Sequence, residues 1–170
     1  MGKQNLVYTC TIATPLGALT ASAVEESLTG LWFNEQKYYP LSSNDWLEEP
    51  DYPVLTKLQA WIDEYFAGIN SAPDFQLNPQ GTAFQKTVWD ALVKIPYGQV
   101  TTYGKIAQNI ALARNLPKMS AQAVGGAVGH NPISILIPCH RVVGSDGSLI
   151  GYASGIDKKE YLLRLEKNSL

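Results

Sequence analysis

A cysteine and a histidine stand side by side in the sequence Ile-Pro-Cys-His-Arg-Val at residues 137–142. The thiolate is the nucleophilic form of cysteine, and nearby positive charge lowers the pKa of a thiol. Cys139 lies between a proline and two residues that carry or acquire positive charge, so this segment predicts a reactive thiol. The alternative is an inert buried cysteine beside a surface histidine.

A carboxylate further along the chain offers a third member for such a site. Glu166 falls in the last turn of a predicted helix, where a negative charge opposes the helix dipole. Its side chain is therefore either solvated or turned inward, where it would orient the imidazole of His140. In the second case Cys139, His140 and Glu166 form an activation chain of the kind used in nucleophilic catalysis.

The remaining composition excludes several classes of protein. Cys10, Cys139, His130 and His140 are the only cysteines and histidines, at spacings that fit no zinc finger, so we expect no metal and no cofactor. No run approaches the roughly 20 apolar residues that span a bilayer. Residues 1–5 are polar, unlike the start of a signal peptide. We therefore expect a cytoplasmic protein that contacts no membrane.

Short helices with polar caps dominate the second half of the chain. Apolar residues recur at helical spacing in residues 83–95, 102–110 and 121–129. Thr82 and Gln85 form a capping box before the first of these helices. A helix, a connector and a short helix of small residues are compatible with a helix-turn-helix, which places its second helix on DNA. Gly125 and Gly126 in that second helix indicate close approach of either another helix or a phosphate backbone.

The segment before the cysteine and the last helix are expected to position the site. Residues 133–137 are predicted to form a buried strand that Pro138 ends. In the last helix, Asp157 with Glu160 predicts a capping pattern and Ile156 with Tyr161 a hydrophobic staple. Its expected buried stripe is Tyr161, Leu162 and Leu165.

The first half of the chain is predicted to be a small sheet with one helix. Alternating patterns predict strands at 6–12, 18–24 and 29–33, and helical spacing predicts a helix at 55–66. Residues 34–52 are predicted to be a polar loop, and residues 70–81 a linker. We place the domain boundary in this linker, which gives domains at 1–78 and 79–170.

The charge of the chain changes sign across the linker. Residues 1–80 carry three basic and ten acidic side chains, whereas residues 81–170 carry ten basic and five acidic ones. The net charge of −2 therefore combines an acidic first half with a basic second half. This asymmetry indicates that the second half meets a polyanion.

The sequence around Cys139 resembles the signature of the O6-alkylguanine-DNA alkyltransferases, also called methylated-DNA–protein-cysteine methyltransferases. Other blocks that resemble this family are Thr14–Gly17, Gly30–Phe33, Gly81–Gln85, Ile95–Gly98, Ala123–Ala127, Asn131–Pro132 and Lys159–Leu163. The resemblance implies an α+β protein. A small N-terminal sheet-and-helix domain of the ribonuclease-H-like type would precede a mainly helical winged-helix or helix-turn-helix domain.

The resemblance also implies a reaction: the direct, irreversible and single-turnover repair of double-stranded DNA by a monomer. A flipped O6-alkylguanine would pass its alkyl group to Cys139, with activity on O4-alkylthymine left open. His140 and Glu166 would activate the thiol, Asn131 would fix the preceding turn, and Tyr103 would press on the DNA backbone and donate a proton to guanine. Pocket positions fall at Val142, Tyr152, Ala153 and Ser154, and DNA-contacting positions at Ala121, Gln122 and Gly125.

The chain departs from the family pattern at three places. Gln122 stands where the family has an arginine that fills the space of the flipped base, the connector at 111–119 is longer than in compact members, and the zinc ligands of some members are missing. Two rival functions remain at this point. One is a silent binder of DNA lesions on the same fold, and the other is a small cysteine hydrolase with His130 as its base.

Overall fold

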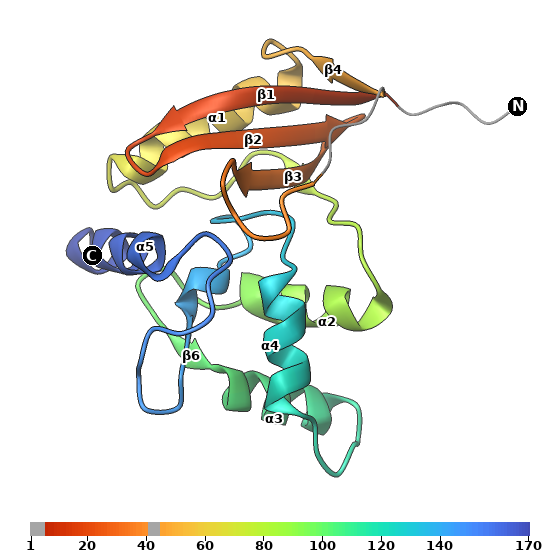
Figure 1. Cartoon of the computed structure of the whole chain (residues 1–170), viewed down its shortest axis with the longest axis vertical. Helices are drawn as coiled ribbons and strands as arrows, with labels where there is room; N and C mark the ends of the chain where they lie inside the picture. Colours follow the sequence, from red (N-terminus) through yellow and green to blue (C-terminus); the bar gives the residue numbers. More distant parts are fainter. Residues whose placement is uncertain (1–5, 41–44) are drawn as a thin grey trace, which may run out of the picture. The chain divides into compact units, whose positions relative to one another are not determined.

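The computed structural model describes residues 6–40 and 45–170. The chain folds as two compact units, Met1–Gln80 and Gly81–Leu170 (Figure 1). Residues 1–5, and residues 41–44 of the predicted 34–52 loop, lie outside the described part of the chain. Within that part, no helix combines the length and the apolar character needed to cross a bilayer.

The first unit contains a five-stranded sheet in the order β4-β1-β2-β3-β5. The strands are β1 (Val7–Thr14), β2 (Gly17–Val24), β3 (Ser27–Phe33), β4 (Trp46–Glu48) and β5 (Gln76–Leu77). The three long strands form an antiparallel meander, and the two short strands pair in parallel at its edges. The predicted strands are thus confirmed, whereas β4 forms within the segment that we predicted to be loop.

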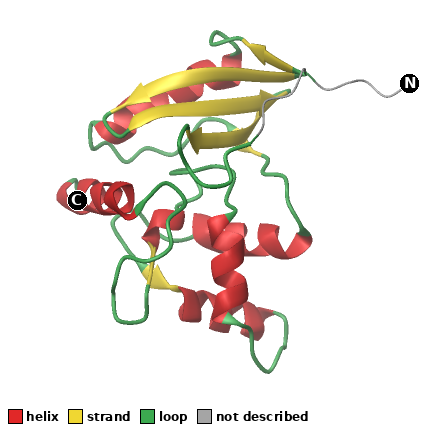
Figure 2. Cartoon of the chain, viewed as in Figure 1, coloured by secondary structure: helices red, strands yellow, loops and turns green. Residues whose placement is uncertain are grey.

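Helix α1 (Pro53–Phe66) covers one face of this sheet (Figures 1 and 2). Its first turn contains Pro53, whose fixed φ suits a helix start. The buried side of the helix consists of Val54, Leu55, Leu58, Ile62 and Tyr65. The apolar spacing in residues 55–66 therefore predicted both the helix and the face that it buries.

The second unit is mainly helical. Its elements are α2 (Ala83–Val93), β6 (Thr101–Thr102), α3 (Tyr103–Ala113), α4 (Ala121–Gly129), the 3₁₀ turn η1 (Cys139–Arg141), β7 (Val142–Val143) and α5 (Ile156–Asn168). Thr82 caps α2 in the predicted capping box with Gln85, while Thr102 caps α3 and Ser120 caps α4. The three helices predicted before the cysteine are confirmed, and β6 pairs with β7 in parallel.

The structure corrects the prediction of a strand at residues 133–137. Ile133 makes an isolated bridge and the next three residues form turns, because Ile135 adopts the left-handed region with a φ of 70°. A strand would need a negative φ at every residue. The segment therefore reaches Cys139 as a folded loop.

The start and the buried face of α5 also differ from expectation. Gly155 occupies the N-cap with no side-chain cap, so the predicted Asp157–Glu160 pattern is wrong. The staple of Ile156 with Tyr161 is wrong as well, since it requires Ile156 to precede the N-cap, whereas Ile156 is the first residue of the helix. The buried residues of α5 are Lys159, Leu162 and Glu166. Lys159 and Glu166 are thus buried in place of the expected Tyr161 and Leu165, and for Glu166 this is the inward one of the two orientations that the sequence left open.

Candidate active site

Cys139 begins η1 and is only 6% exposed. Burial raises the pKa of its thiol, because a thiolate loses the stabilisation of water. A hydrogen bond with the Asn131 side chain and the charge of Lys159 act in the opposite direction. The thiol is thus protonated by default, and two neighbours favour its ionised form.

The Asn131 side chain forms two hydrogen bonds with the backbone of the segment that precedes Cys139. Its side-chain amide donates to the carbonyl oxygen of Ile137 at 2.7 Å, and its Oδ1 accepts from the amide of Ile133 at 3.0 Å. The residue is 4% exposed and directly follows the C-cap of α4. Asn131 therefore links the end of α4 to the chain that leads to the thiol, at the turn where the family resemblance places it.

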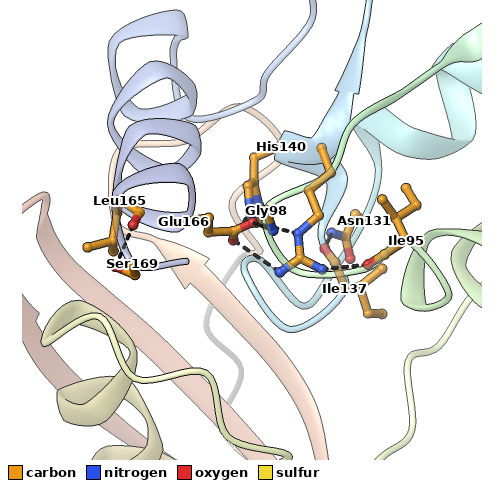
Figure 3. Close-up of polar contacts among 9 residues, drawn as sticks. Ile95, Gly98, Asn131, Ile137, His140, Leu165, Glu166 and Ser169 are labelled. Atoms are coloured by element: carbon orange, nitrogen blue, oxygen red, sulfur yellow. Dashed lines mark hydrogen bonds and ion pairs between the residues drawn. The ribbon is translucent and has the colours of Figure 1, made fainter.

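His140 and Glu166 are in contact and both are 0% exposed. Figure 3 shows Glu166 reaching from α5 toward His140, whose Nε2 lies 2.6 Å from the Glu166 Oε2. Burial lowers the pKa of His140 and outweighs the opposing effect of Glu166, so the imidazole is neutral at pH 7. A neutral imidazole that donates through Nε2 keeps a lone pair on Nδ1. That Nδ1 is buried with no hydrogen-bond partner among the described residues.

Arg141 fixes the carboxylate from the other side. Its Nε and Nη2 donate to the two oxygens of Glu166 at 2.7 and 3.1 Å, and its Nη1 donates to the Ile95 carbonyl oxygen at 2.6 Å. The amide of Gly98 adds a longer contact to Glu166 at 3.4 Å. The guanidinium holds the Glu166 carboxylate in place through two hydrogen bonds, which is the geometry needed to orient an imidazole.

Lys159 and Tyr103 meet at the loop between β7 and α5. The Lys159 Nζ donates to the Ile150 carbonyl oxygen at 2.7 Å, and the Tyr103 hydroxyl lies 3.0 Å from the same oxygen and 3.2 Å from that of Gly151. Burial lowers the pKa of Lys159 to about 8, with Cys139 acting in the opposite direction. Burial likewise raises the pKa of Tyr103, which keeps its proton at neutral pH.

The sequence reasoning missed Arg141 and Lys159 as members of this site. Lys159 shares one face of α5 with Leu162 and Glu166, at i, i+3 and i+7, and this spacing was a usable signal. Arg141 had no such signal beyond its position next to His140. Its role depends on the burial of its partner on α5, which no local pattern reveals.

The expected pocket residues have mixed surroundings. Val142 is 0% exposed in β7, whereas Tyr152, Ala153 and Ser154 are half-buried in the loop before α5. The Tyr152 hydroxyl is buried without a hydrogen-bond partner among the described residues, and burial, with Cys139 and Glu166, raises its pKa. Tyr152 is thus in electrostatic reach of the thiol, with a polar atom that no described residue satisfies.

The expected DNA-contacting residues lie on α4. Ala121 and Gln122 are exposed in its first turn, and Gly125 is half-buried. A Cβ on Gly125 would meet the Tyr103 ring at 3.8 Å, and one on Gly126 would meet nothing within 4 Å. Tight packing of another protein element therefore does not account for the two glycines. No cluster of three or more metal-binding side chains occurs in the described ranges.

Comparison with known proteins identifies the family. Residues 6–79 match the ribonuclease-like domain of 6-O-methylguanine DNA methyltransferase, and residues 83–168 match its DNA-binding domain. The chain is 42% identical over 155 residues to the methylated-DNA–protein-cysteine methyltransferase of Haemophilus influenzae, covering 91% of this chain and 83% of the relative. It is 43% identical over 164 residues to that of Methanosarcina barkeri, covering 96% and 99%.

A solved structure agrees with these matches. The Mycobacterium tuberculosis OGT in complex with DNA aligns with a TM-score of 0.85 and 41% identity, over 96% of this chain and 94% of that one. The chain belongs to the methylated-DNA–protein-cysteine methyltransferase family. The α+β class, with an N-terminal sheet followed by a helical DNA-binding domain, is thereby confirmed.

Proposed function

We propose that this protein repairs DNA by moving the alkyl group of O6-alkylguanine to Cys139 in a single turnover. The observation that carries this proposal is the buried neutral His140. Its Nε2 is bound to Glu166 while its Nδ1, one residue from the thiol, has no partner among the described residues. A neutral imidazole with one free lone pair is the protein group best suited to take a proton near pH 7.

The first step is removal of the thiol proton. The Cys139 proton passes to the Nδ1 of His140 through a bridging water, as the family resemblance implies, and Glu166 stabilises the imidazolium. Burial alone raises the pKa of the thiol, so this help is needed. Asn131 and Lys159 favour the thiolate from the other side. His140, Asn131 and Lys159 thus each oppose the effect of burial, which removes water from the sulfur.

The second step is an in-line displacement at the alkyl carbon. The sulfur of Cys139 forms a bond to that carbon while the bond from carbon to the guanine O6 breaks, and its electron pair leaves with guanine. Tyr103 turns from the Ile150 carbonyl and donates its phenolic proton to the departing base, and the proton taken up by His140 returns to the Tyr103 phenolate through water. The product is a thioether with no good leaving group, so the protein is consumed.

We infer that residues 79–170 form the alkyl-acceptor domain and residues 1–78 a separate N-terminal domain. The helix-turn-helix of α3 and α4 would hold the DNA, with Ala121, Gln122 and Gly125 on its contact face. Tyr152, Ala153, Ser154 and Val142 would line the pocket for the flipped base. A monomer is sufficient for this chemistry, because every proposed group comes from one chain, and a cytoplasmic location stays an expectation from the sequence.

The rival hydrolase has no comparable support. His130 would have to act as its base, yet this residue caps α4, with its Nδ1 2.8 Å from the Gly126 carbonyl oxygen. A silent lesion binder would not need a buried acid–base pair beside its cysteine. The geometry of His140 with Glu166 therefore favours alkyl transfer over both alternatives.

Intact mass spectrometry tests this function. We expect the protein to gain the mass of one methylene after mixing with a duplex that contains O6-methylguanine, since a methyl group replaces the thiol proton. Cys139→Ser should show no gain, whereas the matched control Cys10→Ser should gain as the wild type does. No gain in folded wild-type protein would contradict alkyl transfer, and a gain in Cys139→Ser would contradict the acceptor.

A further inference from the structure

Ile135 has the most unusual backbone conformation near the thiol. The described non-glycine residues with positive φ are Glu25, Tyr38, Asn115 and Ile135. The first three are exposed, whereas Ile135 is 2% exposed and is the only one with a branched Cβ. A branched residue is strained in the left-handed region, and such conformations persist only where the surroundings enforce them.

The hydrogen bonds around Ile135 define a tight reversal of the chain. The amide of Leu136 donates to the carbonyl oxygen of Ser134 at 2.8 Å, which with a φ of 70° between them gives a γ-turn of the rare left-handed kind. The amide of Ile137 donates to the carbonyl oxygen of Ile133 at 3.1 Å. The chain thus folds back on itself within five residues.

This reversal of the chain determines where the backbone just before Cys139 is placed. Six residues of extended chain would span about 20 Å, yet the Asn131 side chain lies 2.7 Å from the carbonyl oxygen of Ile137. That same carbonyl accepts from the amide of Cys139 at 2.8 Å, across Pro138 with its φ of −81° and ψ of 66°. The carbonyl of Ile137 is therefore the common anchor of Asn131 and Cys139, and its position depends on the turn at Ile135.

We propose that Ile135 is a positioning residue for alkyl transfer, and that its left-handed turn places the sulfur of Cys139 against Asn131 and in line with the alkyl carbon. This proposal rests on the proposed function. An in-line displacement is sensitive to geometry, and a misplacement of 1 Å can slow a reaction about a hundredfold. The apolar side chain, buried in the unit, supplies the anchor that keeps the strained turn from relaxing.

Substitutions at Ile135 separate the backbone turn from simple apolar burial. Ile135→Val keeps the anchor and should transfer methyl groups within about threefold of the wild-type rate. Ile135→Ala loses most of the anchor but keeps the steric cost of a Cβ at positive φ, so the turn should relax and the rate fall at least tenfold. Ile135→Gly removes that cost, so its rate should exceed that of Ile135→Ala at least threefold.

Ile133 provides the matched control. It is 0% exposed, lies in the same loop and has no positive φ. At such a position glycine lowers the folding equilibrium constant roughly two- to fivefold relative to alanine. We therefore expect Ile133→Gly to be less stable than Ile133→Ala and no faster in transfer, which is the reverse of the order at Ile135.

The measurements are single-turnover methyl transfer from an O6-methylguanine duplex, normalised to the folded fraction, and the pH profile of Cys139 alkylation by iodoacetamide. The profile of Ile135→Ala should shift to higher pH as the sulfur leaves Asn131, and that of Ile135→Gly should shift less. Equal rates and equal profiles for these two variants would overturn the proposal. If Ile135→Ala does not fold, a folded Ile135→Gly variant supports the proposal. An Ile135→Gly variant that also fails to fold overturns the proposal. Alkylation of Cys139 by iodoacetamide does not require DNA repair. The difference between the pH profiles of Ile135→Ala and Ile135→Gly therefore tests this proposal even if the proposed function is wrong.

Discussion

Replacing Glu166 with glutamine perturbs the buried network at its centre. The carboxylate accepts from the His140 Nε2 at 2.6 Å and from Arg141 at 2.7 and 3.1 Å. An amide has only one acceptor oxygen and presents its NH₂ to one of these donors. Arg141, whose side chain is 11% exposed, also loses its counter-charge. Removing one partner of a buried ion pair costs about 3–5 kcal/mol, and the partial exposure of Arg141 places our expectation near 3 kcal/mol.

The effect on the reaction should be larger than the effect on stability. The neutral amide is a weaker acceptor than the carboxylate for the Nε2 proton of His140 and cannot stabilise an imidazolium, so the His140 Nδ1 becomes a poorer base. Loss of positioned general-base catalysis slows a reaction about 10²- to 10⁴-fold. A domain with about 5–15 kcal/mol of stability remains folded after losing about 3 kcal/mol, so the rate can be measured on native protein.

The assay pairs urea unfolding with single-turnover methyl transfer. Glu160→Gln is the matched control, because Glu160 lies on the same helix in an exposed pair with Arg164 at 2.7 Å. Such i,i+4 pairs contribute about 0.3–0.5 kcal/mol, so this variant should unfold and react nearly as the wild type does. A loss below about 1 kcal/mol in Glu166→Gln, together with a rate within about threefold of the wild type, would refute the reasoning.

Three further outcomes are expected. Burial lowers the pKa of His140, so the unfolded chain binds a proton that the native state excludes. Stability should then hold above about pH 6.5 and fall below it; urea midpoints in which His140→Gln keeps the full acid slope would contradict this. Lys159→Met should slow the reaction of iodoacetamide with Cys139 at pH 7 several-fold, because the charge of Lys159 lowers the pKa of the thiol, whereas exposed Lys167→Met should not; equal rates for the wild type and Lys159→Met would show that this charge does not act on the thiol. Gln122→Arg should tighten binding to a lesion duplex and steepen its salt dependence by about one phosphate contact; unchanged fluorescence anisotropy would show that this position does not enter the DNA.

Local patterns predicted most of the secondary structure. The capping box of Thr82 with Gln85 appears as predicted, because both groups lie within one turn and satisfy each other. The buried positions Val88, Trp89 and Leu92 of α2 follow from helical spacing alone. Short-range chemistry decides these features, so the sequence contains the information needed to find them.

Features that depend on contacts between residues far apart in the chain could not be predicted from the sequence. Ile135 has a high strand propensity, yet tertiary burial forces it into a left-handed turn. Lys159 is a charged residue outside the buried stripe that we expected for this helix, and its burial is decided by the Ile150 carbonyl and the thiol. By contrast, the sequence left two orientations of Glu166 open, solvated or inward, and the structure places its side chain against His140.

The stoichiometry and destination of a labelled methyl group test the central claim most directly. A duplex carrying a radiolabelled O6-methyl group, mixed in excess with the protein, should transfer one label per protein molecule and then stop. Peptide mapping should find that label on Cys139. Continued release of label beyond one equivalent, label recovered as methanol, or label on any other residue would contradict the proposal that Cys139 is a single-use alkyl acceptor.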